Sequence, residues 1–549
     1  MSVRLLLTSA LEKVRLDQAP APCSERFTVL KEDQFSFQAA FLPESDGIAH
    51  RADYQVIVSG PLSGLVQVRY VEQVPVRLPA FDASDGLYLD TRPGLYPDLL
   101  RPLYEKDHVP AVRGQWTSLW IEVRTTKETP AGTYPLTLSI RNETEDASLT
   151  AEICVMNAVL PEQRLKHTEW FHMDGLSSYY HEPVFSPRFM EIVRAQIRTA
   201  VRRGINMLLT PLWTPPLDTR VGSERLTAQL LDIEVVDGQY RFSFDRLRDF
   251  MNMAREEGIR YFEMSHLFTQ WGAKCCPKII ATVDGKPSRI FGWDTPATGD
   301  AYRGFLEALL PELTAQLKSW GYGDCVYFHI SDEPSPESLP QYKACRAMVE
   351  HLLAGFPIMD AMSDHSFFEQ GICRTPVVAT NHLTPFLEDP RPDEFWVYYC
   401  CGQGYKVSNR FIAMPSWRTR ILGVQLYKFA VDGFLQWGYN YYNNVTSIHP
   451  IDPFATTDGE ASYPAGDPFV VYPGPDGEPL ESLRLVVLSD ALCDLRALTL
   501  LETLTSRDHV LSLIEDGLEE PLSFEDYPHS PDYLLSLRRR VNEEIEQHL

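Results

Sequence analysis

A repeated order of strand, loop and helix begins near residue 165, and it restricts the possible folds of this chain more than any other feature of the sequence. Short apolar segments predict buried strands, and the longer amphipathic segments between them predict helices. The expected strands are 168–174, 205–212, 260–267, 325–333, 357–362, 376–382, 395–401 and 433–442, and the main helices between them are 186–203, 245–258, 299–320, 336–356 and 415–431. Eight such units predict a (β/α)8 barrel of the TIM type, with its active site over the carboxyl ends of the strands.

The segments on either side of this region follow other patterns. Residues 1–162 alternate apolar and polar side chains in short segments separated by Pro, Gly and Asp, which predicts an antiparallel β-sandwich. We interpret it as a support domain, with carbohydrate binding as the alternative. After the barrel at 163–445, residues 446–549 form a third domain. The loop at 443–480 is expected to cover the barrel mouth, and a helical extension follows at 481–502, 507–515 and 530–547.

The fourth expected strand ends in two adjacent carboxylates, Asp332 and Glu333, followed by a proline. Strand parity places Glu333 on the same face as His329, toward the barrel lumen. Asp332 joins it only if the backbone turns out of strand geometry, and the Ser-Asp-Glu-Pro ending favours such a turn. The alternative is that Asp332 or Ser331 merely caps the next helix.

Polar and aromatic residues also follow the other expected strands. They are Asp174, Trp213, His266, Asn381, His382, Tyr398, Trp437, Tyr439 and Asn440. Each one alone can be a core residue with a satisfied polar atom. Around a carboxylate pair, however, they suit a sugar site, because aromatic rings stack on the apolar face of a pyranose and polar groups fix its hydroxyls. We therefore predict a carbohydrate pocket with Asp332 and Glu333 as catalytic residues and these others as substrate-binding residues.

Composition excludes several classes of partner. With 50 basic and 75 acidic residues, the formal charge of −25 opposes nucleic-acid binding. The ten cysteines are too dilute for a disulfide framework, and we interpret them as free thiols. A zinc site of Cys275, Cys276 and His266 is the alternative, which ligand spacing disfavours. No phosphate-binding or dinucleotide motif is present, so neither a cofactor nor a metal is expected.

The sequence also bears on location. No stretch reaches the roughly 18 apolar residues that a membrane helix needs, and the first residues do not resemble a signal peptide. We therefore expect a cytoplasmic protein with no membrane partner. The sequence leaves a homo-oligomer open.

Six motifs together resemble a known family. They are WFHMDG (170–175), TPPLDT (214–219), MSHLFTQWGAK (264–274), FHISDEP (328–334), GFLQWGYN (433–440) and YPGP (472–475). They resemble the bacterial domain of unknown function 4091 family, which is similar to the catalytic domain of glycoside hydrolase family 123, the β-N-acetylgalactosaminidases. The resemblance spans residues 120 to 500. It implies a retaining hydrolase in which Asp332 orients the substrate's 2-acetamido group and Glu333 is the general acid and base.

The adjacency of the two carboxylates favours the same chemistry. A retaining enzyme with its own nucleophile needs carboxyl groups about 5–5.5 Å apart across the scissile bond, commonly from different strands. If the acetamido oxygen attacks instead, two carboxyls on one side suffice. Adjacency thus fits the oxazoline mechanism, and the resemblance to family 123 implies an exo-glycosidase that removes terminal β-linked N-acetylgalactosamine from an oligosaccharide or glycoconjugate through that intermediate. Trp437 and Tyr439 are the best candidates for pocket wall and acetamido contact.

Two alternatives stay open. One is a glycosidase of the same fold that acts on a β-N-acetylglucosaminide or an unsubstituted glycoside, with Asp364 or Asp174 as an enzymic nucleophile. The other is a non-catalytic carbohydrate-binding protein, against which the intact Asp332–Glu333 pair speaks.

Overall fold

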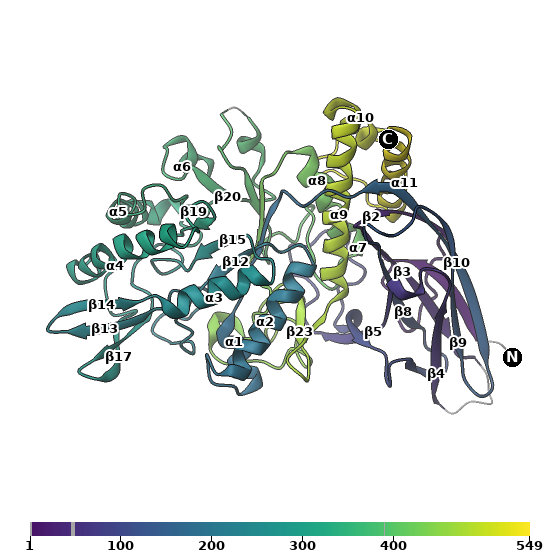
Figure 1. Cartoon of the computed structure of the whole chain (residues 1–549), viewed down its shortest axis with the longest axis horizontal. Coiled ribbons are helices and arrows are strands. Elements are labelled where there is room, and N and C mark those ends of the chain that lie inside the picture. Colours follow the sequence, from purple (N-terminus) through teal and green to yellow (C-terminus); the bar gives the residue numbers. More distant parts are fainter. Residues whose placement is uncertain (1–2, 45–49, 389) are drawn as a thin grey trace.

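The computed structural model describes residues 3–44, 50–388 and 390–549. It is a multidomain chain, with a sheet-rich N-terminal region and a C-terminal domain built around a nearly closed barrel of eight parallel strands. Figure 1 shows the N-terminal sheets at one end, the barrel helices at the other, and helix α9 (Leu483–Leu504) standing between them.

The N-terminal region contains two five-stranded sheets whose facing side chains share one hydrophobic cluster. One sheet has the order β1 (Arg4–Ser9), β3 (Gln34–Leu42), β8 (Thr117–Arg124), β5 (Val66–Val76) and β6 (Gly94–Pro102). The other has the order β2 (Arg26–Lys31), β10 (Asp146–Val159), β9 (Gly132–Arg141), β4 (Arg51–Ser59) and β7 (His108–Val112). All pairs are antiparallel except β10 with β2, which is parallel. The prediction of a wholly antiparallel arrangement is wrong there, because no hairpin turn joins these two strands and fixes their direction.

All eight expected barrel strands are present, each shorter than predicted. They are β11 (Lys166–Glu169), β12 (Met207–Thr210), β15 (Tyr261–Met264), β18 (Val326–Tyr327), β19 (Met359–Ala361), β20 (Thr375–Ala379), β21 (Trp396–Tyr398) and β22 (Gly433–Gln436). The strands run in parallel in the order β18-β15-β12-β11-β22-β21-β20-β19. Between β18 and β19 only a bridge at Phe328 and Ile358 continues the ladder, with Phe328 N–H donating to Pro357 O at 3.0 Å. The barrel therefore has a seam beside β18, the strand that precedes Asp332 and Glu333 in the chain.

Helices follow the strands largely as predicted. They are α1 (Met173–Tyr180), α2 (Pro187–Arg202), α3 (Asp245–Glu256), α4 (Asp300–Ser319), α5 (Leu339–Val349), α6 (His365–Glu369), α7 (Ser416–Arg420), α8 (Leu422–Lys428), α9, α10 (Arg507–Glu515) and α11 (Pro531–Gln547). Serine caps start α2 and α9, where Ser186 and Ser482 each accept a backbone N–H at 3.1 Å. The predicted helix at 415–431 is two helices, and the one at 336–356 is α5 preceded by a short 3-10 turn.

Two hairpins interrupt the barrel repeat and were not predicted. The hairpin β13 (Asp232–Val236) to β14 (Gln239–Ser243) follows β12, and the hairpin β16 (Ile279–Val283) to β17 (Lys286–Phe291) follows β15. They join into one sheet through parallel pairing of β13 with β16. Each turns at an Asp-Gly pair with positive φ, namely Asp237-Gly238 and Asp284-Gly285. Asp-Gly between alternating residues is the sequence signal that predicts such a hairpin.

A buried cluster of charges joins the N-terminal sheets to the barrel. Arg203, at the end of α2, donates to Glu122 Oε1 and Oε2 at 2.9 Å and to Glu481 Oε1 at 2.7 Å. Arg69 of β5 pairs with the same two carboxylates, and the side chains of all four residues are at most 5% exposed. The arginines outweigh the effect of burial and hold the pKa of Glu122 at about 2. Glu122 and Glu481 each accept hydrogen bonds from both arginines, which is the compensation that buried carboxylates require.

Two further sequence predictions concern cysteines and membranes. All ten cysteines are free thiols, as predicted. In the part of the chain that the structure describes, no helix combines the length and the apolar character that a membrane span requires.

Candidate active site

The backbone after β18 leaves the sheet because a side chain replaces its strand partner. The N–H groups of Ile330 and Ser331 donate to Asp360 Oδ1 at 3.0 and 3.3 Å. The chain then turns, and Glu333 adopts a left-handed φ of 43°. A non-glycine residue in this region is strained and persists only where its surroundings hold it. The turn brings Asp332 and Glu333 to the same pocket, as the sequence predicted.

The helix-capping alternative for this segment is wrong. The capping box at the start of the following 3-10 turn is made by Ser335 and Ser338. Ser331 Oγ instead donates to Thr269 O at 2.8 Å, and the Asp332 carbonyl accepts the Trp271 N–H at 2.9 Å. The Asp332 and Glu333 carboxylates are therefore free to act in the pocket.

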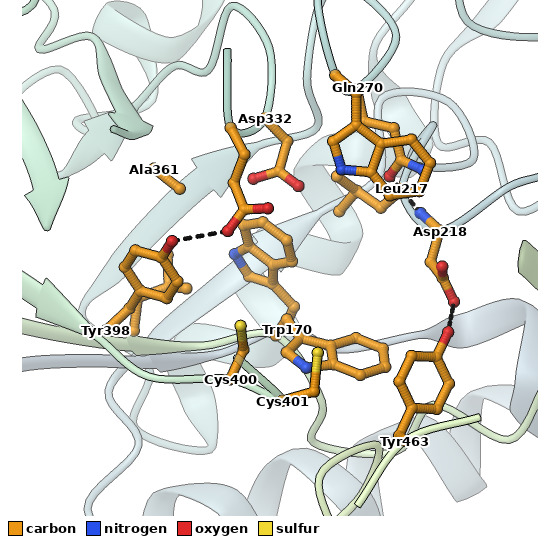
Figure 2. A pocket seen from close by; sticks show the side chains of 14 residues that line it. Trp170, Leu217, Asp218, Gln270, Asp332, Ala361, Tyr398, Cys400, Cys401 and Tyr463 are labelled. Carbon is orange, nitrogen blue, oxygen red and sulfur yellow. Dashed lines mark hydrogen bonds between the residues drawn. The ribbon is translucent and has the colours of Figure 1, made fainter. Parts of the chain in front are cut away.

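A pocket of about 130 Å³ lies over the carboxyl ends of the barrel strands. Figure 2 shows Asp332, Tyr398 and Trp170 around its centre, with Asp218 and Tyr463 on the far side. Its lining residues are Trp170, Leu217, Asp218, Gln270, Trp271, Asp332, Glu333, Ala361, Tyr398, Cys400, Cys401, Leu435, Trp437 and Tyr463. Apolar and aromatic walls around a few carboxyl and hydroxyl groups are the composition of a sugar site.

The two carboxyl groups occupy different surroundings. Glu333 is exposed, and its Oε1 accepts a hydrogen bond of 2.6 Å from Tyr398 OH. Asp332 is only partly exposed, and its pKa is raised well above the usual value, first by burial and then by the neighbouring Glu333. Like charges this close repel each other, so the Glu333 carboxyl disfavours a negative charge on Asp332.

A charged network lies in the lumen beneath the pair. Glu263 accepts hydrogen bonds from Trp170 Nε1 at 3.1 Å and from His329 Nε2 at 2.8 Å. His329 Nδ1 lies 3.5 Å from Asp360 Oδ1, and Tyr342 OH donates to Asp360 Oδ2 at 2.6 Å. Burial alone lowers the pKa of His329, but Asp360 and Glu263 outweigh it and raise that pKa to about 9. His329 is therefore a buried cation near Asp332, and it offsets in part the rise in the pKa of Asp332 that burial and Glu333 cause.

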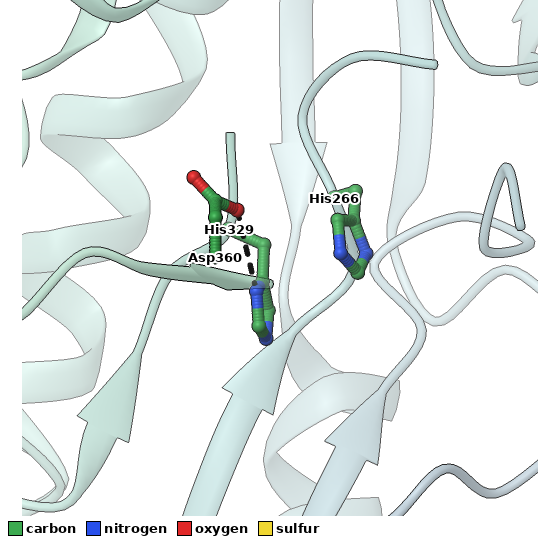
Figure 3. Close-up of side chains that lie close together, drawn as sticks. All are labelled: His266, His329 and Asp360. Carbon is green, nitrogen blue, oxygen red and sulfur yellow. Dashed lines mark ion pairs between the residues drawn. The ribbon is translucent and has the colours of Figure 1, made fainter. Parts of the chain in front are cut away.

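Figure 3 shows His266 stacked beside His329, near Asp360. The two rings lie 4.3 Å apart, and the ligand atoms of all three residues fall within 4.8 Å of one another. Burial, and then the charge of His329, hold the pKa of His266 well below its usual value. A metal needs the free lone pair of a neutral imidazole, whereas both nitrogens of His329 face carboxylates. The arrangement therefore suits a proton better than a metal ion.

The zinc alternative is not supported. Among the described residues, His266, His329 and Asp360 are the one group of three such ligands close enough to share an ion. Cys275 and Cys276 do not converge with His266.

Four of the predicted site residues line the pocket, namely Asp332, Glu333, Tyr398 and Trp437. Trp437 is partly exposed, and its Nε1 donates to Asp467 Oδ2 at 2.8 Å. Asp467 and Tyr463 belong to the loop at 443–480, and Tyr463 lines the pocket, so this loop reaches the barrel mouth as expected.

The other predicted residues do not line this pocket. Asp174 pairs with Arg225 at 2.6 Å, and the buried Trp213 donates from Nε1 to His266 O at 3.0 Å. Tyr439 OH donates to Gln196 O at 3.0 Å, and Asn440 Oδ1 accepts the His172 N–H at 2.7 Å. His266 lies below in the lumen, and Asn381 and His382 are exposed and bonded to each other at 2.8 Å. The strands end earlier than predicted, so strand parity no longer gives the direction of these side chains.

Several lining residues were not predicted. Trp170, one residue beyond β11, is in a quoted motif but was not assigned to the site. Asp218, Gln270 and Trp271 come from the loops that precede the two hairpins. Tyr463 comes from a long irregular loop, and its OH donates to the Asp218 carboxylate. No periodicity in the sequence indicates that such loop residues meet. The available signal was residue type, because every tryptophan is a candidate for stacking on a sugar.

Comparisons with known proteins bear on this pocket. Residues 170–501 match the model of the glycoside hydrolase 123 catalytic domain. No curated protein matches the chain.

Among solved structures, the chain is similar to a family 123 glycoside hydrolase from Clostridium perfringens that was studied for glycolipid glycan hydrolysis. The two share 15% identity at a TM-score of 0.72, over 100% of this chain and 97% of that chain. This likeness shows the fold. A putative α-galactosidase from Bacteroides fragilis matches over 88% of this chain and 79% of that chain, with 11% identity, but its TM-score of 0.26 carries no argument.

Proposed function

The chain belongs to the glycoside hydrolase 123 family, and we propose that it is a retaining exo-glycosidase that releases terminal β-linked N-acetylgalactosamine. One observation carries the proposal: the strained turn after β18 presents two adjacent carboxyl groups to one small pocket. A pocket of about 130 Å³ suits a single terminal sugar better than a chain segment. Trp170 and Trp437 supply aromatic surface for the apolar face of that sugar.

In the proposed reaction the substrate's acetamido oxygen attacks C1, and the bond from C1 to the leaving oxygen breaks. Glu333 donates its proton to that oxygen, while the Asp332 carboxylate accepts the acetamido N–H and stabilises the positive charge of the oxazolinium. Water then opens the oxazoline ring at C1 and returns its proton to Glu333. C1 is inverted twice, so the product keeps the β configuration.

The charges around the pair bear on this division of roles. The mechanism needs one proton and one negative charge on the two carboxyls, which is the state that their closeness favours. Burial and then Glu333 raise the pKa of Asp332 well above its usual value, and the His329 cation lowers it by less. The proposed reaction therefore needs the acetamido N–H, which donates to Asp332, to favour the charge on that residue. Tyr398 OH holds Glu333, which is the more exposed of the two carboxyls, as suits a group that protonates a leaving oxygen at the pocket mouth.

The second candidate is a glycosidase in which a carboxylate of the protein attacks C1. We now consider a different carboxylate from Asp364 and Asp174, which the sequence suggested. Asp364 is exposed and caps α6 by accepting the Ser366 N–H, and Asp174 is held by Arg225. Asp218 is the remaining carboxylate in the pocket lining. Asp218→Asn separates the two mechanisms, because it should abolish hydrolysis only if this residue attacks C1.

The proposal also includes a family subgroup, domain boundaries and a cellular location. The quoted motifs favour the domain of unknown function 4091 family as the subgroup. We also propose the boundaries 1–162, 163–445 and 446–549, and a reducing, cytoplasmic location that suits ten free thiols.

Hydrolysis of nitrophenyl glycosides tests the proposal. The β-N-acetylgalactosaminide should be cleaved far faster than the β-galactoside, because a 2-hydroxyl cannot replace the attacking acetamido oxygen. A thiazoline analogue of the oxazoline should inhibit strongly, since analogues of high-energy states bind about 10²–10⁸-fold tighter than substrate. Proton NMR should show the β anomer first. An α anomer, or efficient cleavage of the galactoside, contradicts substrate assistance, and preference for the gluco epimer contradicts the sugar assignment.

A second prediction concerns Asp360, which we propose to be a positioning residue. Asp360→Asn removes a carboxylate that holds the 330–331 backbone and His329. We expect kcat to fall by about 10²-fold, the scale of a 1 Å misplacement of reacting groups. The matched control is Asp364→Asn, close by in the chain, where asparagine caps a helix as well as aspartate. Counting active sites with the thiazoline corrects for unfolded protein, and an unchanged kcat per site contradicts the positioning role.

A further inference from the structure

Cys400 and Cys401 place two thiol groups side by side on the pocket wall. Figure 2 shows both sulfur atoms near Trp170, and both residues line the pocket. The thiols are close enough to share a hydrogen bond, and neither is in a disulfide. The proposed cleavage of the glycosidic bond does not use them.

A tight turn holds the pair in place. Gln403 N–H donates to Cys400 O at 3.1 Å, and Gln403 Oε1 accepts the Cys400 N–H at 2.9 Å and its Sγ–H at 3.3 Å. Asn409 Nδ2 also donates to Cys400 O at 2.9 Å. Because the turn is fixed in advance, a ligand that both sulfur atoms bind loses little affinity to ordering of the chain.

The surroundings favour a positive ligand. The pocket that both thiols line also contains the Asp218, Asp332 and Glu333 carboxylates. Negatively charged carboxylates disfavour a single thiolate nearby, but they attract a cation into the same space. Thiolate sulfur is the ligand that soft metal ions select.

We propose that Cys400 and Cys401 form a dithiol site for a soft divalent cation such as Zn²⁺ or Cd²⁺, and that the bound ion blocks the pocket. Binding forms two metal–sulfur bonds and releases two thiol protons to solvent, with no change of oxidation state. The blocking effect rests on the proposed function, because it requires that the sugar enters here. Binding itself does not.

Titration of the purified chain with CdCl₂, followed by the ultraviolet absorption of cadmium–thiolate bonds, tests the site. One ion per chain is expected. Cys400→Ser and Cys401→Ser should each weaken binding by at least about tenfold, since even outer partners of metal ligands contribute 10–100-fold. The matched control is the double change Cys275→Ser and Cys276→Ser, which alters the other adjacent pair and should leave the absorption intact. Absorption that persists without Cys400 and Cys401 overturns the proposal.

Maleimide labelling of the unaltered chain avoids any dependence on the variants. Cd²⁺ should protect the peptide that carries Cys400 and Cys401, and equal labelling with and without the ion overturns the site. For the blocking effect, saturating Cd²⁺ should abolish glycoside hydrolysis and a chelator should restore it. Full activity at saturation overturns blocking. If the chain cleaves no glycoside, the proposed function fails. The absorption and labelling experiments then still show whether the two thiols bind the ion.

Discussion

Glu333→Gln is expected to lower kcat for natural oligosaccharides by about 10²–10⁴-fold, the usual contribution of general acid assistance. Glutamine keeps the shape of the side chain and can still contact Tyr398, but it has no proton to give to the leaving oxygen. Folding should be unchanged, because Glu333 is exposed and buries no charge. Steady-state kinetics on an oligosaccharide, with the melting temperature as a check, measures both effects.

Leaving-group dependence sharpens the test of Glu333. An activated aryl glycoside needs little protonation, so its first step should suffer much less than that of the oligosaccharide. Asp332→Asn should impair both substrates alike, because it removes the charge that stabilises the oxazolinium. The matched control is Glu337→Gln, an exposed carboxylate four residues on, which should leave both rates unchanged. Equal losses on both substrates for Glu333→Gln would move the general acid to another residue.

Arg203→Met is expected to lower the free energy of unfolding by about 3–5 kcal/mol, the cost of removing one partner from a buried ion pair. The change leaves Glu122 and Glu481 buried with fewer compensating charges. The matched control is Arg202→Met. Arg202 contacts the same Glu481 at 2.7 Å, but its side chain is 41% exposed, so its loss should cost at most about 1 kcal/mol. Urea denaturation measures both variants, and equal losses would contradict a special role for burial.

The same cluster predicts a pH dependence. The folded pKa of Glu122 is about 2, below its ordinary value of 4.5. This carboxylate therefore contributes its full stability above pH 4.5 and loses it as the pH falls toward 2. In Arg203→Met, the buried Glu122 and Glu481 carboxylates lack one compensating positive charge. Protonation of these carboxylates at low pH removes negative charge and so reduces the destabilisation. The stability gap between the original chain and Arg203→Met should therefore narrow as the pH falls from 7 to 3, and a constant gap would contradict this account.

The sequence predicted the barrel because its strands are buried on both faces, so that their apolar composition alone identifies them. It predicted that Asp332 and Glu333 meet at one pocket, because they follow such a strand directly and a turn of one or two residues sufficed. Trp213, Tyr439 and Asn440 lie beyond strands that end early, and there the direction of a side chain depends on loop packing. Arg203 and Glu122 are separated by 81 residues in sequence, and charged residues ordinarily predict a surface. Nothing local indicates that they meet in the interior.

The two hairpins have a mechanical consequence. Leu217 and Asp218 lie on the loop before β13, and Gln270 and Trp271 lie on the loop before β16. The parallel pairing of these two strands ties the loops at one end, while the Asp218 N–H donates to Gln270 Oε1 at the other. Loops fastened at two points cannot swing independently. These two segments of the pocket wall should therefore behave as one mechanical unit, so that any displacement of one loop displaces the other.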